Sequence, residues 1–163
     1  MGLITYLAED NHTILENLIE TLQEIASVEV MGHGATEAEA RGWLTSHEGQ
    51  WQLAILDLFL QEGSGLGVLA ACRQRAFHQK VVVLTNYASP EIRKRSAELG
   101  ADAVFDKSSE LDGLFAFCLE QNARTLVREA GRAGAGQQPE LRRDQQADQD
   151  RGAGSATRNS PLS

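Results

Sequence analysis

Residues 53–85 read LAILDLFLQEGSGLGVLAACRQRAFHQKVVVLT, and this stretch decides the fold class. It begins with a short apolar run at residues 53–56 and ends with residues 81–84, four residues of high β propensity that lead into Thr85. Between them, a glycine-containing loop precedes an apolar segment at residues 66–72 that has helical spacing. The stretch therefore predicts a strand, a helix and a second strand parallel to the first.

Similar runs lie on both sides of this unit. They predict further strands at residues 3–8, 28–31 and 103–105, and helices at residues 14–25, 36–47, 90–100 and from residue 111 onward. Thr36 and Glu39 have the spacing of a capping box, and Pro90 fits the first turn of a helix. Five strands alternating with five helices predict a flavodoxin-like α/β sandwich of three layers, with a parallel sheet of strand order 2-1-3-4-5.

Residues 131–163 differ in composition from the rest of the chain. Their only large apolar side chains are Leu141 and Leu162. Such a segment cannot bury enough apolar surface to offset its ordering entropy. We therefore expect a folded domain over residues 1–130 and a disordered, low-complexity tail over residues 131–163. A partner-binding peptide around residues 140–144 is the alternative for the tail.

The composition excludes several classes of protein. The chain has 15 Lys and Arg against 23 Asp and Glu, a net charge of −8, which disfavours binding to nucleic acid or to anionic membranes. Its apolar runs are shorter than the ~20 residues that cross a bilayer, and its start lacks the pattern of a signal peptide. Cys72 and Cys118 are too few for a disulfide framework. We expect a cytoplasmic protein with both cysteines in its core.

Polar side chains follow four of the predicted strands. Glu9 and Asp10 follow the first, Asp57 the third, Thr85 the fourth and Lys107 the fifth. Ligands of such sheets bind at the carboxyl ends of the strands, where the strand order reverses. Converging carboxylates need a cation between them, and ligation by oxygen atoms suits Mg²⁺. Because Lys107 adds a positive charge and Thr85 a hydroxyl group, the set predicts a site for a phosphoryl group.

This set resembles the receiver domain of bacterial two-component response regulators, over roughly residues 1–125. The matching motifs are LAILDL before the acceptor, SGLGVL after it, VVVLT ending at the threonine, and LGADAVFDKS around the lysine. The resemblance implies that Asp57 accepts a phosphoryl group from the phosphohistidine of a histidine kinase. It also implies that Asp10, Asp57 and the backbone carbonyl of Phe59 bind Mg²⁺, with Glu9 acting through water.

The resemblance also implies how the signal is passed on. Lys107 would pair with Asp57 and then with the phosphoryl oxygens, while Thr85 would bond a phosphoryl oxygen and shift its loop. A downstream protein would read this change on the surface formed by the fourth helix, fifth strand and fifth helix. The upstream partner would be a sensor histidine kinase or a histidine phosphotransfer protein, and phosphorylation could drive homodimer formation. The chain would be a stand-alone receiver in a phosphorelay, a phosphoacceptor that catalyses only its own phosphoryl transfer and dephosphorylation.

Four positions depart from the family pattern, one of them Gln61, which stands in the loop after the acceptor where proline is frequent. Asn86 follows the threonine where a small residue is frequent, and Ser108 follows the lysine where proline is common. Val104 stands where an aromatic residue often couples to the threonine. Phe105 and Tyr87 are the candidates to replace that aromatic residue.

Other functions remain open at this point. An aspartyl phosphatase of the haloacid-dehalogenase type needs a second carboxylate two residues after the nucleophile, where this chain has Phe59. A receiver-like adaptor would bind its partners without phosphorylation. A third option is the receiver remnant of a transcriptional regulator that lost its DNA-binding domain. The basic triplet at residues 93–95 is either a solvated helix face or part of a partner surface.

Overall fold

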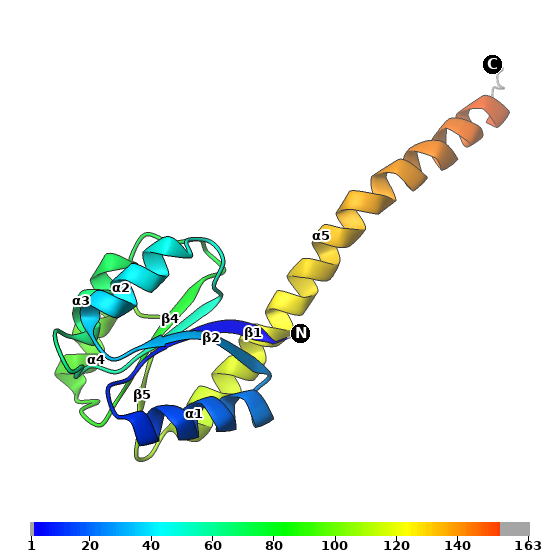
Figure 1. Ribbon diagram of the computed structural model, residues 1–163. Helices are drawn as coiled ribbons and strands as arrows, with labels where there is room; N and C mark the ends of the chain where they lie inside the picture. The colour runs from blue at the N-terminus through cyan, green and yellow to red at the C-terminus, as the bar shows by residue number, and fades with distance from the viewer. Residues whose placement is uncertain (1, 154–163) are drawn as a thin grey trace. The chain divides into compact units, whose positions relative to one another are not determined.

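A computed structural model describes the backbone of residues 2–153 and the side chains of residues 2–132. Strands and helices alternate along this part of the chain (Figure 1). In chain order they are β1 (Leu3–Ala8), α1 (His12–Ile25), β2 (Val28–Gly34), α2 (Glu37–Ser46), β3 (Leu53–Leu56), α3 (Gly65–Ala71), β4 (Lys80–Thr85), α4 (Pro90–Glu98), β5 (Ala103–Asp106) and α5 (Leu111–Ala153).

The five strands form one parallel sheet of order β2-β1-β3-β4-β5, which confirms the predicted fold class. Its register determines which side chains meet at the carboxyl edge. Ala8 lies opposite Leu56, so the residues that follow β1 and β3 are neighbours. Thr85 lies opposite Asp106, so the last residue of β4 lies beside the end of β5.

Helices cover both faces of the sheet, and a hydrophobic core lies between the sheet and each layer. On one face, buried leucines of α1 pack against β1 and β3 together with Leu114 and Cys118 of α5. On the other face, α2 and α3 pack over Tyr6 and Leu56. Burial on both faces explains why the central strands are continuous apolar runs rather than alternating ones. Both cysteines are buried, as predicted.

The helix starts predicted from Thr36 and Pro90 are confirmed, whereas α1 begins at His12, two residues before its predicted start. The Thr36 hydroxyl accepts a hydrogen bond from the Glu39 amide at 3.1 Å and caps α2. Pro90 is the first residue of α4, and Ser89 caps that helix. Gly100, just after α4, has a φ of 103°, a conformation that favours glycine.

Helix α5 continues beyond residue 130, where we expected the fold to end. The backbone of residues 131–153 is helical, while the disorder of the tail and the domain boundary at residue 130 stay predictions. Helical hydrogen bonds are local, and this segment is rich in the helix-favouring residues Ala, Gln and Arg, although Pro139 and four glycines oppose a helix. The chain divides into two compact units, Met1–Ala123 and Arg124–Ser163. Residues 154–163, to which the prediction of disorder also applied, lie outside the described residues.

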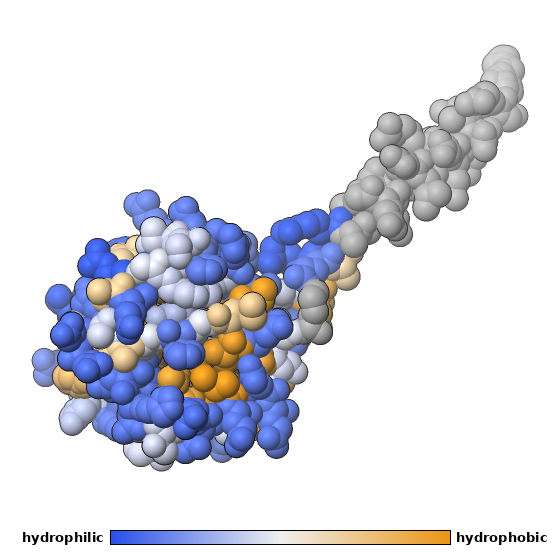
Figure 2. Space-filling model, viewed as in Figure 1, coloured by the Kyte–Doolittle hydropathy of each residue, from blue (hydrophilic) through white to orange (hydrophobic). Residues whose placement is uncertain are grey.

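The surface of the domain is mostly hydrophilic in the view of Figure 2, with apolar atoms gathered near α1 and β2. Ile25, at the end of α1, and Met31, on β2, are large apolar side chains that are more than half exposed. Within residues 2–153, none of the helices has the length and apolar character needed to cross a membrane.

Candidate functional site

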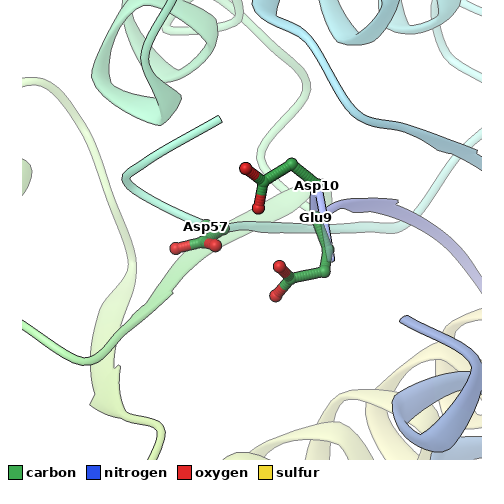
Figure 3. Close-up of side chains that lie close together, drawn as sticks. All are labelled: Glu9, Asp10 and Asp57. Atoms are coloured by element: carbon green, nitrogen blue, oxygen red, sulfur yellow. The ribbon is translucent and has the colours of Figure 1, made fainter. Parts of the chain in front are cut away.

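Three carboxylates meet at the carboxyl ends of β1 and β3. Glu9 and Asp10 directly follow β1, and Asp57 directly follows β3, its neighbour in the sheet. Ligand oxygens from the three side chains lie within 4.8 Å of one another (Figure 3). Glu9 and Asp57 are buried, whereas Asp10 is exposed, so solvent reaches the cluster on the side of Asp10.

The backbone holds the two buried carboxylates in place. The Asp57 amide donates to the Ala8 carbonyl at 2.8 Å, and the Glu9 amide donates to the Gly34 carbonyl at 3.0 Å, so both residues are tied to neighbouring strands. The Asn11 amide donates to Glu9 Oε2 at 3.1 Å. These bonds fix the carboxylates before any ligand arrives, which is the preorganisation that a binding site needs.

The loop after Asp57 requires a glycine at position 65. The Gly65 amide donates to the Leu58 carbonyl at 2.9 Å, which closes the loop. A Cβ atom on Gly65 would lie 2.0 Å from the Asp57 carbonyl oxygen. Phe59 lies in the same loop, and its amide donates to Asp57 Oδ1 over 3.4 Å. The ligand role of the Phe59 carbonyl stays a prediction.

Lys107 supplies the positive charge of the cluster. Its Nζ donates to Glu9 Oε1 at 2.6 Å and to Asp57 Oδ2 at 3.0 Å, and its side chain is only 12% exposed. Burial alone would lower the pKa of Lys107, but the hydrogen bonds to Glu9 and Asp57 outweigh it, and the pKa is raised. The ammonium group therefore stays charged and already bonds the proposed acceptor oxygen.

Thr85 is fully buried at the end of β4. Its hydroxyl accepts a hydrogen bond from the Tyr87 amide at 3.1 Å, and its carbonyl accepts one from the Lys107 amide at 2.9 Å. The backbone therefore joins two of the predicted site residues directly, and the Thr85 hydroxyl bonds its own loop in this structure.

An aromatic pair in the loops that follow Asp57 and Thr85 was not predicted from the sequence. The rings of Phe59 and Tyr87 meet edge to face with their centroids 4.9 Å apart, and both residues are more than half exposed. They follow Asp57 and Thr85 by two residues each, a spacing that could have suggested their proximity. Phe105 instead packs against Phe117 of α5, with centroids 6.0 Å apart.

The donor set fits a hard divalent cation. Carboxylate oxygens are the ligands that Mg²⁺ takes in proteins, and the exposure of Asp10 leaves room for the waters that Mg²⁺ retains. Three carboxylates and one ammonium group carry a net charge of −2, which a dication would balance. Asp10, Asp57 and Glu9 are the side chains that could hold it.

Comparisons with known proteins agree with this geometry. Residues 5–118 match the family described as "Response regulator receiver domain". The uncharacterized transcriptional regulatory protein YvfU of Bacillus subtilis is 28% identical over 109 residues, which are 67% of this chain and 54% of that protein. The chain spans 35% and 54% of the length of the two curated relatives it matches first.

Solved structures share the fold. The receiver domain of the putative response regulator NarL from Mycobacterium tuberculosis has a TM-score of 0.62 and 21% identity, covering 73% of this chain and 91% of that one. A chain of the CheX–CheY–BeF3–Mg²⁺ complex from Borrelia burgdorferi has a TM-score of 0.61 and 13% identity, covering 71% of this chain and 88% of that one. With the family match extending over most of its length, this chain belongs to the response regulator receiver domain family.

Proposed function

We propose that this chain is a phosphorylation-dependent signalling switch whose phosphoacceptor is Asp57. The observation that carries the proposal is the acidic cluster of Glu9, Asp10 and Asp57, held against Lys107 at adjacent strand ends. An acidic pocket of this kind is typical of the phosphoacceptor site of receiver domains. The phosphohistidine donor, from a sensor histidine kinase or a phosphotransfer protein, is part of the proposal.

Catalysis of phosphoryl transfer consists mainly of positioning the reactants and stabilising the charge of the transferred group. A carboxylate oxygen of Asp57 attacks phosphorus in line with the imidazole of the donor. The new O–P bond forms as the P–N bond breaks, and the electron pair of that bond stays on the imidazole nitrogen. Lys107 neutralises charge on the phosphoryl oxygens, and Mg²⁺, when bound by the carboxylates, supplies further neutralisation. The product is an acyl phosphate on Asp57.

Thr85 is the proposed reporter of that event. Its hydroxyl would leave the Tyr87 amide, its partner at 3.1 Å, to donate to a phosphoryl oxygen. Such a turn moves the loop that connects β4 to α4. We propose that a downstream protein reads this movement on the surface of α4, β5 and the start of α5, and that the switch works in the cytoplasm, as receiver domains typically do.

The other candidates make different predictions. An aspartyl phosphatase would turn over phosphate monoesters, but Phe59 occupies the position of its acid/base group and cannot transfer a proton. A phosphorylation-independent adaptor would bind partners equally well with Asp57 replaced. Nothing in the geometry of the described residues favours either over a phosphoacceptor.

The test is phosphorylation of the full chain by acetyl phosphate, followed by intact-protein mass. We expect one phosphoryl group to be added in the presence of Mg²⁺ and none in the presence of EDTA. The added group should be labile in base. Asp57→Asn should abolish the gain, whereas Asp112→Asn, which removes an exposed aspartate of α5, should not. A gain that survives Asp57→Asn, or sustained turnover of a phosphate monoester, would refute the proposal.

A further inference from the structure

One arginine of α4 connects three neighbouring segments of the domain. Arg93, in α4, donates from Nε to the Ala88 carbonyl at 3.1 Å and from Nη1 to the Val104 carbonyl at 3.1 Å. Its Nη2 donates to Glu110 Oε1 at 2.6 Å. A single guanidinium therefore ties the loop before α4, strand β5 and the residue before α5 to one another.

Both ends of this network reach the phosphoacceptor site. Ala88 lies three residues after Thr85 in the same loop. Glu110 Oε1 also accepts a hydrogen bond at 2.9 Å from the amide of Asp106, the neighbour of Lys107. The Lys107 amide in turn donates to the Thr85 carbonyl. A shift of Thr85 or Lys107 therefore acts directly on the partners of Arg93.

Helix α4 has little else to hold it. Ser96 is the only buried side chain among its nine residues. Within the described residues, the Ser96 hydroxyl has no hydrogen-bond partner. A buried hydroxyl without a partner is unfavourable, so this position of α4 carries a cost that a different position could remove. A helix held by so few buried contacts can shift against the sheet at low cost.

We propose that Arg93 is a latch that holds α4 in the unphosphorylated arrangement and opens when Asp57 is phosphorylated. The proposal rests on the proposed function. As the Thr85 hydroxyl turns toward the phosphoryl group, the loop carries the Ala88 carbonyl away from Arg93, and the pair with Glu110 separates. A guanidinium and a carboxylate then become available to a partner on the surface of α4 and β5.

The latch takes over a role that Val104 cannot fill. Where many family members carry an aromatic ring, this chain has a valine, and Arg93 bonds the carbonyl of that same residue. Phe105 lies on the other face of the sheet from Val104, packed against the core of α1 and α5, so its ring does not substitute for an aromatic ring at position 104. The connection from loop to helix surface therefore runs through Arg93.

The strength of the pair suits a switch. The side chains of Arg93 and Glu110 are 41% and 40% exposed, so the pair is screened by solvent and weak. Hydrogen bonds from Arg93 and then from the Asp106 amide lower the pKa of Glu110, which keeps it ionised at neutral pH. With the backbone hydrogen bond to Ala88 added, the latch should favour the closed arrangement by roughly tenfold, within the range of allosteric couplings.

The test uses BeF3⁻ with Mg²⁺ as a mimic of the phosphoryl group. By thermodynamic linkage, a contact that stabilises the unphosphorylated arrangement lowers the affinity for a ligand that favours the phosphorylated arrangement. Arg93→Ala should therefore bind BeF3⁻ about tenfold more tightly than the wild type, as measured by calorimetry on the full chain. Arg95→Ala is the matched control, since it removes the same charge from an exposed position on the same helix. Loss of a cation by itself weakens anion binding, so tighter binding cannot come from charge alone.

A second variant tests the latch without depending on the folding of Arg93→Ala. Glu110→Gln keeps the size of the side chain and should also tighten binding, and combining it with Arg93→Ala should add little further. Hydrogen exchange of the α4 amides should be faster in both single variants without BeF3⁻ and equal to the wild type with it.

The outcomes separate the two proposals. If the wild type binds BeF3⁻ and both Arg93→Ala and Glu110→Gln bind it no more tightly than Arg95→Ala, the latch is wrong and the phosphoacceptor site stands. If the wild type fails to bind BeF3⁻ with Mg²⁺, the proposed function falls and the latch with it.

Discussion

Replacing Lys107 by alanine tests the electrostatics of the site most sharply. The ammonium group contacts Glu9 at 2.6 Å and Asp57 at 3.0 Å, and those side chains are 3% and 9% exposed. Without it, three carboxylates remain within 4.8 Å of one another with no compensating charge from the lysine. Two such charges at that distance repel by about 3 kcal/mol at an effective dielectric constant near 20.

From these contacts we expect Lys107→Ala to lower the free energy of unfolding by about 3 kcal/mol in the absence of divalent ions, because breaking a buried ion pair costs roughly 3–5 kcal/mol. The lower end applies because Asp10 is exposed and admits water. For a domain of this size the loss corresponds to a fall in Tm of about 10 °C. Saturating Mg²⁺ should restore much of it and should stabilise the variant more than the wild type, since a dication replaces the missing charge.

Urea unfolding with and without Mg²⁺, followed by tryptophan fluorescence, measures both effects. Trp51 is buried and reports on the core. Lys94→Ala, which removes an exposed lysine of α4, is the control and should change stability little. A loss below about 1 kcal/mol, the size of a surface pair, would refute the reasoning, as would equal stabilisation of variant and wild type by Mg²⁺.

The same ion pairs give the wild type a dependence on alkaline pH. The folded pKa of Lys107 is raised above its ordinary value of 10.5. A group with a raised folded pKa contributes stability that is fully present below pH 10.5 and is lost as the pH rises through the folded value. Above pH 10.5 the wild type should therefore lose more stability than Lys107→Ala, and parallel losses would contradict this.

Three further changes test the packing. Gly65→Ala places a Cβ 2.0 Å from the Asp57 carbonyl oxygen, so it should lower the free energy of unfolding by about 1–3 kcal/mol and slow phosphorylation. Gly42→Ala, in an open position within α2, should raise the free energy of unfolding by about 0.5–1 kcal/mol, as measured in urea. Equal effects of the two variants would contradict the clash at Gly65. Ser96→Ala removes a buried hydroxyl without a partner among the described residues and should raise Tm by a few degrees, so a fall would reveal a partner. Burial raises the pKa of Cys118 to about 12, so a thiol reagent should modify it only as fast as the domain opens.

The fold was predictable because burial leaves a direct record in the sequence. Strands β1 and β3 are covered on both faces, and their predicted bounds, residues 3–8 and 53–56, agree with the structure. Strand β2 was predicted to end at Met31 but extends to Gly34. The extra residues include two glycines, which have low β propensity. A tertiary contact explains the glycine at position 32, because a Cβ there would lie 2.4 Å from the Trp43 ring.

The core of the site was predictable for a similar reason. Parallel strands bring their carboxyl ends to one edge, so the acidic residues after β1 and β3 had to meet there. The part played by Arg93 was not predictable, because residues 93–95 are three cations in a row and the sequence does not distinguish them. Only the packing of α4 against β5 selects Arg93 for the contacts with Val104 and Glu110.

The central claim, that Asp57 is the phosphoacceptor, is tested most directly by chemical mapping of the modified residue. The full chain is phosphorylated with acetyl phosphate and Mg²⁺ and then treated with borohydride, which reduces an aspartyl phosphate to homoserine. Tandem mass spectrometry of the peptide that contains residues 53–60 locates the change. We predict homoserine at position 57 and at no other position. Homoserine at position 10 instead, or at no position in a fully recovered chain, would contradict the account.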